Sequence, residues 1–138
     1  MLNYKKIISR LLDQNIYILS NDDKEAIIID PGLGFDLIDR YLKSENLSPI
    51  AVLATHAHID HIASANDCIK NYNIPFYICR GNSIMLDHYD IMKGYMNVDS
   101  EKPEVSHWIE DSDKKLIIGS FEFNVNYNPG HSPGCMSF

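Results

Sequence analysis

The segment IAVLAT, at residues 50–55, constrains the fold more than any other part of the chain. Its first five residues are apolar, and Ser48-Pro49 separates it from the segment before it. A strand this short and this apolar is typical of a parallel sheet that is covered on both faces. The segment therefore predicts a buried strand in a layered fold.

Patterns on both sides of this strand extend the prediction. Residues 15–20 (NIYILS) and 25–30 (EAIIID) are β-rich runs joined by a polar turn, which indicates a hairpin that ends at Asp30-Pro31-Gly32. The complete set comprises strands at 15–20, 25–30, 50–55, 76–79, 115–118 and 121–127, helices at 35–44, 60–72 and 83–92, and a loop at 94–103. Because strands alternate with helices, we expect an α/β or α+β fold in a single domain, residues 1–138.

The composition disfavours several classes of protein. With 45% hydrophobic and 22% charged residues, the chain is expected to form a packed, soluble domain. The formal net charge of −7 argues against a sequence-independent grip on nucleic acid or on an anionic membrane, and no apolar run could span a bilayer. The three cysteines form no CxxC pair, and no signal-peptide core is found. We therefore expect a cytoplasmic protein with reduced thiols that binds neither nucleic acid nor membrane.

Three of the six histidines stand directly after the buried strand, in the sequence THAHIDH at residues 55–61. His56 and His58 follow while the chain is still extended, so both imidazoles point to one side, which suits two ligands of one metal ion. Asp60 and His61 open the next helix, and they can present an oxygen and a nitrogen to a neighbouring site. Aspartate and histidine also occur at helix starts as capping residues, but this spacing and position favour a metal site.

His131 stands in the turn-rich loop NPGHSPG at residues 128–134, after the last predicted strand. A lone loop histidine is usually solvated. Zinc, however, is held by at least three protein ligands in structural and catalytic sites, and the pair His56 and His58 supplies only two. This shortfall favours His131 as a third ligand of the same zinc ion.

These motifs resemble those of the metallo-β-lactamase superfamily. THAHIDH at 55–61 is similar to its HxHxDH motif, NPGHSPG at 128–134 to its PGHTPG loop, and IDPG at 29–32 to its DPG turn, in the family's order. Within the superfamily, the chain looks most like small thioesterases of the hydroxyacylglutathione hydrolase (glyoxalase II) type. The resemblance implies a four-layer αβ/βα sandwich made of two similar halves.

The resemblance also implies roles for individual residues. Carried over by position, the ligands of the first metal ion are His56, His58 and His131. Asp60 and His61 would belong to a second metal ion, and Asp30 would support the ligand loop. The implied reaction is hydrolysis of a small-molecule thioester or other acyl compound, in which hydroxide held by zinc attacks the carbonyl and a thiolate leaves. Asp60 would be the catalytic residue that orients this hydroxide or takes its proton.

The sequence departs from the family pattern at its end, because it stops at Phe138. In the family, a later aspartate bridges the two metal ions and a later histidine completes the second site, and neither has a counterpart here. We therefore expect one zinc ion, an incomplete second metal site and an incomplete second half of the sandwich. The strand at 121–127 would lie at an unfinished sheet edge, which indicates either a truncated product or a homodimer that completes the sheet.

Several alternatives stay open. Gly134-Cys135 is similar to the same region of persulfide dioxygenases with one iron ion, and the missing second-site ligands allow a catalytically silent metal-binding module. A metal-dependent nuclease of the same fold is disfavoured by the acidic net charge. His88 and His107 are interpreted as surface or packing residues and Cys135 as a buried thiol. Core packing, in preference to a substrate cleft, is expected for Met85, Tyr89, Met92, Tyr95 and Met96.

Overall fold

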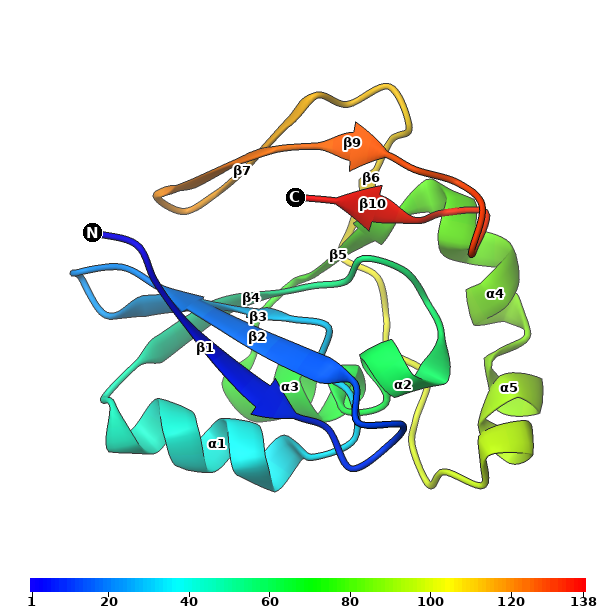
Figure 1. Cartoon of the computed structure of the whole chain (residues 1–138), viewed down its shortest axis with the longest axis horizontal. Coiled ribbons are helices and arrows are strands. Elements are labelled where there is room, and N and C mark those ends of the chain that lie inside the picture. The colour runs from blue at the N-terminus through cyan, green and yellow to red at the C-terminus, as the bar shows by residue number, and fades with distance from the viewer.

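A six-stranded mixed sheet runs through the computed structural model, which describes residues 1–138 (Figure 1). Its strands lie in chain order, with β1 to β3 antiparallel and β3 to β6 parallel. Their bounds are Asn3–Ile8 (β1), Asn15–Ser20 (β2), Glu25–Ile29 (β3), Ser48–Leu53 (β4), Phe76–Cys79 (β5) and His107–Ile109 (β6). The predicted hairpin and the predicted buried parallel strand are both confirmed, although the buried strand begins and ends two residues earlier than expected.

Helices connect the parallel strands, and α1 and α3 lie below the sheet in the view of Figure 1. The connection from β3 to β4 is α1 (Phe35–Ser44), and that from β4 to β5 comprises α2 (Ile59–Ile62) and α3 (Ala65–Tyr72). The connection from β5 to β6 comprises the 3-10 turn η1 (Arg80–Asn82), α4 (Ser83–Asp87) and α5 (Tyr89–Met96). Because these strands are parallel, their carboxyl ends meet at one edge of the sheet, where polar side chains follow β3, β4 and β5.

The sheet contributes to two separate hydrophobic cores because it is covered on both faces. In β3, Ile28 packs in the core shared with α1 and α3, whereas its neighbour Ile27 packs in the core on the opposite face. In β4, Val52 and Leu53 divide in the same way. All four side chains are fully buried. Adjacent apolar residues in one strand are therefore explained by the two buried faces of a parallel sheet.

Two small antiparallel sheets form the layer on the opposite face. In one, β7 (Lys115–Ile118) pairs with β8 (Phe121–Asn124), and in the other, β9 (Asn126–Tyr127) pairs with β10 (Met136–Ser137). The prediction of one continuous strand at 121–127 is therefore wrong. Val125 separates the two strands because the chain changes its partner there, from β7 before Val125 to β10 after it.

The prediction of a single helix at 60–72 is also wrong, because the segment is divided into α2 and α3. The N–H of Ser64 donates to the carbonyl of Pro31 at 2.9 Å, so it does not continue the helical ladder of α2. Ser64 Oγ in turn accepts from the N–H of Gly34 at 3.2 Å. These bonds tie the break to the turn after β3, and the periodicity of one segment cannot reveal a contact with another segment.

Three further differences from the prediction are small. The single helix predicted at 83–92 is two helices, α4 and α5. Helix α5 also extends to Met96, into the segment that was predicted as a loop. Strands β1 and β6 were not predicted, because β1 is a mostly exposed edge strand and β6 has only three residues. None of these differences moves the histidine motifs away from the carboxyl edge of the sheet.

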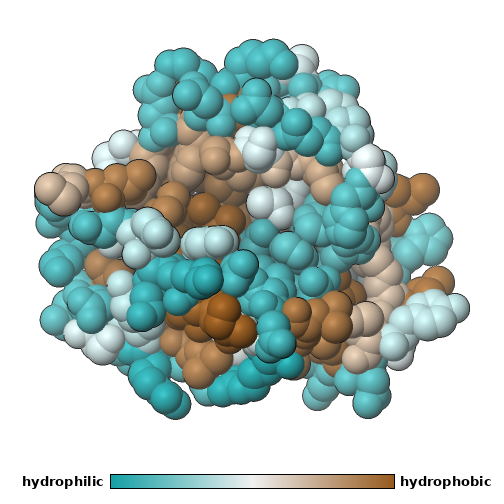
Figure 2. All heavy atoms as spheres, in the orientation of Figure 1, coloured by the Kyte–Doolittle hydropathy of each residue, from teal (hydrophilic) through white to brown (hydrophobic).

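Helices, central sheet and small strands thus form three layers, which confirms a mixed α/β fold. Figure 2 shows apolar atoms on the near face, between the six-stranded sheet and the strands above it. A hollow of about 330 Å³ lies beside Met1, and Leu2, Phe121 and Phe123 are among the other residues that line it. No helix is both long enough and apolar enough to cross a membrane.

Candidate metal centre

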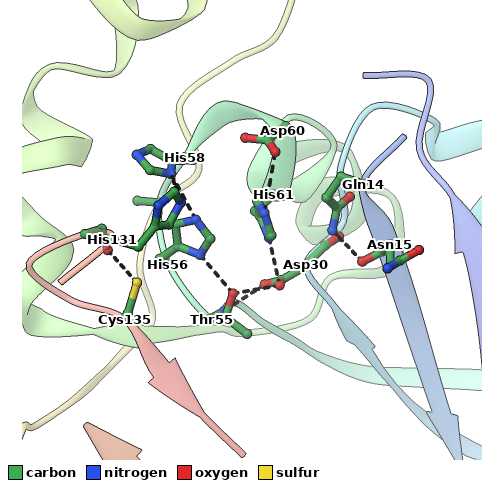
Figure 3. Close-up of polar contacts among 12 residues, drawn as sticks. Gln14, Asn15, Asp30, Thr55, His56, His58, Asp60, His61, His131 and Cys135 are labelled. Atoms are coloured by element: carbon green, nitrogen blue, oxygen red, sulfur yellow. Dashed lines mark hydrogen bonds and ion pairs between the residues drawn. The ribbon is translucent and has the colours of Figure 1, made fainter. Parts of the chain in front are cut away.

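The predicted ligands lie at the carboxyl edge of the sheet, where the chain leaves β4 (Figure 3). The chain bends at Thr55 after β4, and the backbone of His58 is extended, with φ −66° and ψ 145°. The side chains of His56 and His58 both face the loop between β9 and β10. His131 reaches them from that loop. Elements far apart in the sequence therefore bring three imidazoles together.

The nitrogens of these three histidines converge on one point. His58 Nδ1 lies 3.0 Å from His56 Nε2 and 3.0 Å from His131 Nε2, and all three candidate ligand atoms lie within 4.8 Å of one another. A ring nitrogen carries either one proton or one lone pair, so His58 Nδ1 cannot donate to both neighbours. Nitrogens around tetrahedral zinc are separated by about 3.3 Å, given Zn–N distances of about 2.0–2.1 Å. The spacing and chemistry of the three donors therefore fit a metal ion.

The protonation of the cluster suits metal binding. Burial, together with the nearby positive charge of His61 and His58, lowers the pKa of His56 to about 4. Burial and the neighbouring His131 also lower the pKa of His58. Both imidazoles are therefore neutral at neutral pH, which is the form that binds a metal.

A hydrogen-bonded chain orients His56. Asp30 accepts from the N–H and from the hydroxyl of Thr55, both at 2.7 Å. Because the only hydroxyl proton of Thr55 goes to the carboxylate, Thr55 Oγ1 is left to accept from His56 Nδ1 at 3.0 Å. This tautomer leaves the lone pair on His56 Nε2, the atom that faces the other two histidines.

Asp30 itself has an unusual backbone. Its φ is 50°, in the left-handed region that aspartate and asparagine tolerate better than most residues, and it directly precedes Pro31. Gln14 Nε2 donates to the Asp30 carbonyl at 3.2 Å, and the N–H of Gly32 donates to the same carbonyl at 2.8 Å. These bonds hold the turn so that the carboxylate points toward Thr55 and His61.

Asp60 and His61 lie beside the three-histidine cluster but outside it. The ring of His61 is 4.1 Å from that of His56 between centroids, its Nδ1 is 2.9 Å from Asp30 Oδ2, and its Nε2 is 3.5 Å from Asp60 Oδ2. Burial alone would lower the pKa of His61, but the hydrogen bond and charge of Asp30 and the charge of Asp60 together raise it. The pair offers one oxygen and one nitrogen, which is fewer ligands than a closed metal site needs.

An apolar hollow of about 350 Å³ opens next to the cluster. His58 and Asp60 line it, together with Leu12, Ile59, Met92, Tyr95 and Met96. The expectation of core packing is wrong for Tyr95, which is 87% exposed. It holds for Tyr89, which is 1% exposed, and for Met85, Met92 and Met96, which pack against the helix-side core, although Met92 and Met96 also line the hollow.

The other residues weighed from the sequence lie apart from the cluster. His88 and His107 are exposed, and the ring of His107 stacks on Tyr77 with 4.6 Å between centroids. Cys135 is half-buried, and its Sγ lies 3.1 Å from Ser132 Oγ. Asn82 was not singled out from the sequence, yet its buried side chain contacts both ligand-bearing segments. An asparagine in a weakly patterned segment gives no local signal of such a role.

The three histidines at the carboxyl edge of a mixed α/β sheet form a group that could hold a metal ion. The family described as "Metallo-beta-lactamase superfamily" matches residues 9–138. The chain belongs to this superfamily of metallo-hydrolases, as its three motifs implied. Membership and the histidine cluster together support an enzyme with a metal cofactor.

Individual relatives agree with this assignment. The chain is 33% identical over 129 residues to the probable metallo-hydrolase YqgX of Bacillus subtilis, covering 92% of this chain and 60% of the relative. It is 24% identical over 143 residues to the hydroxyacylglutathione hydrolase GloC of Haemophilus influenzae, covering 99% of this chain and 66% of the relative. The chain spans about three fifths of the length of the first curated relatives that it matches.

Solved structures share the fold. The BLEG-1 B3 metallo-beta-lactamase has a TM-score of 0.85 and 36% identity, with 97% of this chain and 65% of that chain covered. TTHA1623, solved in a di-iron-bound form, has a TM-score of 0.82 and 24% identity, with 96% of this chain and 64% of that chain covered. Similar proteins thus include lactamases and other metallo-hydrolases, so the family alone does not select a substrate.

Proposed function

We propose that this chain carries the metal site of a hydrolase that acts on thioesters or related acyl compounds. The observation that carries the proposal is the convergence of three ring nitrogens beside an apolar hollow, with His58 Nδ1 3.0 Å from both His56 Nε2 and His131 Nε2. These three residues would hold one metal ion, for which zinc is our choice, because three imidazoles and an open fourth position are a common ligand set of catalytic zinc.

The metal ion, when bound, would act as a Lewis acid that polarises a carbonyl and lowers the pKa of water. The residues around it do the rest of the work. Asp60 lines the hollow together with His58, so its carboxylate can accept the proton of the attacking water. Asp30 and Thr55 hold the His56 ring in one tautomer and one orientation. Asp60 and His61 form the remaining part of a second site that we propose is incomplete.

The apolar hollow supports a substrate with an uncharged acyl or thiol group. No lysine or arginine lines it, and its side chains next to His58 and Asp60 are aliphatic, thioether or aromatic. A thioester carbonyl near the histidines would place one of its two substituents against this wall. The likeness to GloC supports the thioester class, while the likeness to BLEG-1 makes lactams a comparison that must be measured.

Iron is the alternative metal. TTHA1623 was solved in a di-iron-bound form, and Cys135 stands close after the His131 loop as in the persulfide-dioxygenase resemblance. Imidazole nitrogen binds zinc and iron alike, so the ligand set does not choose between them. A catalytically silent metal-binding module is the second candidate function, favoured by the two-ligand pair of Asp60 and His61.

A hydrolysis assay tests the proposal. The protein, loaded separately with zinc and with ferrous iron, is incubated with an S-acyl glutathione, an S-acyl N-acetylcysteamine and a penicillin. We expect thiol release from the thioesters by the zinc form, loss of that activity with a chelator, and no opening of the lactam. Bound metal without any turnover would overturn the hydrolase and favour the silent module, while sulfite production from glutathione persulfide and O₂ by the iron form would favour the dioxygenase.

A further inference from the structure

Asn82 lies between the two segments that carry the candidate ligands, and its side chain is fully buried. It is the last residue of η1, which directly follows β5. Its Oδ1 accepts from the N–H of Ala57 at 3.0 Å. Its Nδ2 donates to the carbonyl of Gly134 at 2.8 Å and to that of Cys79 at 3.1 Å.

These three bonds join the two ligand segments at close range. Ala57 stands between His56 and His58, and Gly134 belongs to the same turn as His131. Both donor hydrogens of the asparagine amide are used, and all three partners are backbone groups. The one direct backbone bond between the segments, from the N–H of Met136 to the carbonyl of Thr55 at 2.9 Å, lies at the start of β10.

Packing around Asn82 leaves no room for an alternative arrangement. A Cβ on Gly134 would lie 2.5 Å from the backbone nitrogen of Asn82 and would also collide with its side-chain amide. A Cβ on Gly81 would lie 2.6 Å from the carbonyl oxygen of Pro133. The η1 turn and the His131 loop approach so closely because each has a glycine at the point of contact.

We infer that Asn82 is a positioning residue that fixes His131 relative to His56 and His58 before a metal ion binds. The inference rests on the proposed three-histidine site. Without Asn82, one buried N–H and two buried carbonyls lose their partner, and the His131 loop must be ordered when the metal binds. Residues that support ligands in this way typically change metal affinity by about 10- to 100-fold.

The test compares Asn82→Ala with Asn66→Ala. Asn66 is also buried, and its side chain bonds to Glu101, which belongs to neither ligand segment, so it controls for the loss of a buried amide. The measurements are the dissociation constants of zinc and cobalt by chelator competition, the visible absorption of the cobalt form, and the melting temperature without metal. We expect Asn82→Ala to bind both metals about 10- to 100-fold more weakly with an altered cobalt spectrum, and Asn66→Ala to change only the melting temperature.

Two results would overturn the inference while leaving the proposed site intact. One is an Asn82→Ala protein that melts earlier but keeps wild-type affinity and a wild-type cobalt spectrum, since the residue would then be only structural. The other is rapid solvent exchange of the Asn82 side-chain amide protons in the metal-free wild-type protein, measured by NMR, which stays decisive if the variant does not fold. Failure of the wild-type protein to bind either metal would instead refute the proposed site itself, and the inference with it.

Discussion

His56 and His61 lie next to each other, yet their pKa values shift in opposite directions. Burial and the positive charge of neighbouring imidazoles lower the pKa of His56 to about 4. For His61 burial acts in the same direction, but the hydrogen bond and charge of Asp30 and the charge of Asp60 together outweigh it and raise the pKa. The difference separates a histidine that is ready to bind a metal from one that is held by a carboxylate.

The lowered pKa of His56 makes the stability of the metal-free protein depend on pH. Between pH 6.5 and about 4 the unfolded chain binds a proton at this position that the folded protein does not, so stability is lost as the pH falls. His58 adds to the effect, whereas His61, with its raised pKa, opposes it by favouring the folded state at low pH. We expect the free energy of unfolding, from urea titrations, to drop by on the order of 1 kcal/mol from pH 7 to pH 5, after allowance for screening by solvent.

A matched variant isolates this effect. His56→Gln removes the titrating group, so its stability should fall less between the same two pH values. Unfolding free energies that rise toward pH 5 in the wild-type protein would contradict the assigned pKa shifts. Most carboxylates titrate below pH 5, so they stay ionised between pH 7 and pH 5. Acid denaturation through protonated carboxylates therefore does not obscure the result.

Asp30→Asn tests the carboxylate that links the β3 turn to the histidines. Asparagine also tolerates the left-handed backbone at this position, so the substitution removes the charge without adding backbone strain. Burial of His61 is then unopposed by Asp30, and we expect its pKa in the metal-free protein to fall below the ordinary value of 6.5. NMR titration of the imidazole protons measures it. Asp36→Asn is the control, because Asp36 pairs with Arg10 at the surface, and an unchanged His61 pKa in Asp30→Asn would contradict the role given to Asp30.

At the scale of single elements, β3 shows why the apolar runs are continuous. Ile27 and Ile28 are both fully buried but belong to different cores. We expect Ile27→Ala and Ile28→Ala each to lower the free energy of unfolding by about 2–5 kcal/mol in denaturant titrations. Ile117→Ala serves as the control, because Ile117 is 66% exposed and its loss should cost little. A small cost for either buried isoleucine would mean that one face of the sheet is not tightly packed.

Elements were predictable where their signal is local. The apolar run of β4, the turn after β3 and the spacing of His56 and His58 are each contained in a few residues, so the strand, the turn and the grouping of these histidines could be predicted. Their role as metal ligands stays a prediction. The break between α2 and α3 depends on Ser64 bonding to Pro31, and the break at Val125 depends on a change of partner strand from β7 to β10. Neither contact leaves a trace in hydrophobic periodicity. Asn82 escaped notice for the same reason, because its partners lie in two other segments.

At the scale of the whole molecule, the layers explain how the centre is assembled. The sheet aligns the ends of β3 and β4, and the layer of small strands on the opposite face supplies His131. The hollow near Met1, lined by Phe121 and Phe123, leaves apolar surface beside β8. Pairing with a second copy through this region stays a prediction, as does the absence of nucleic-acid binding expected from the net charge of −7. Light scattering of the purified protein measures whether two copies pair.

The most direct test of the three-histidine centre is elemental analysis of the purified wild-type protein and of His131→Ala. After incubation with zinc and removal of the excess by dialysis, we expect about one zinc ion per wild-type chain and much less in the variant, since two imidazoles alone hold zinc weakly. The matched control is His107→Ala, which removes an exposed histidine stacked on Tyr77 and should leave the metal content unchanged. Wild-type protein that retains no metal, or a His131→Ala protein that retains as much as the wild type, would contradict the centre described above.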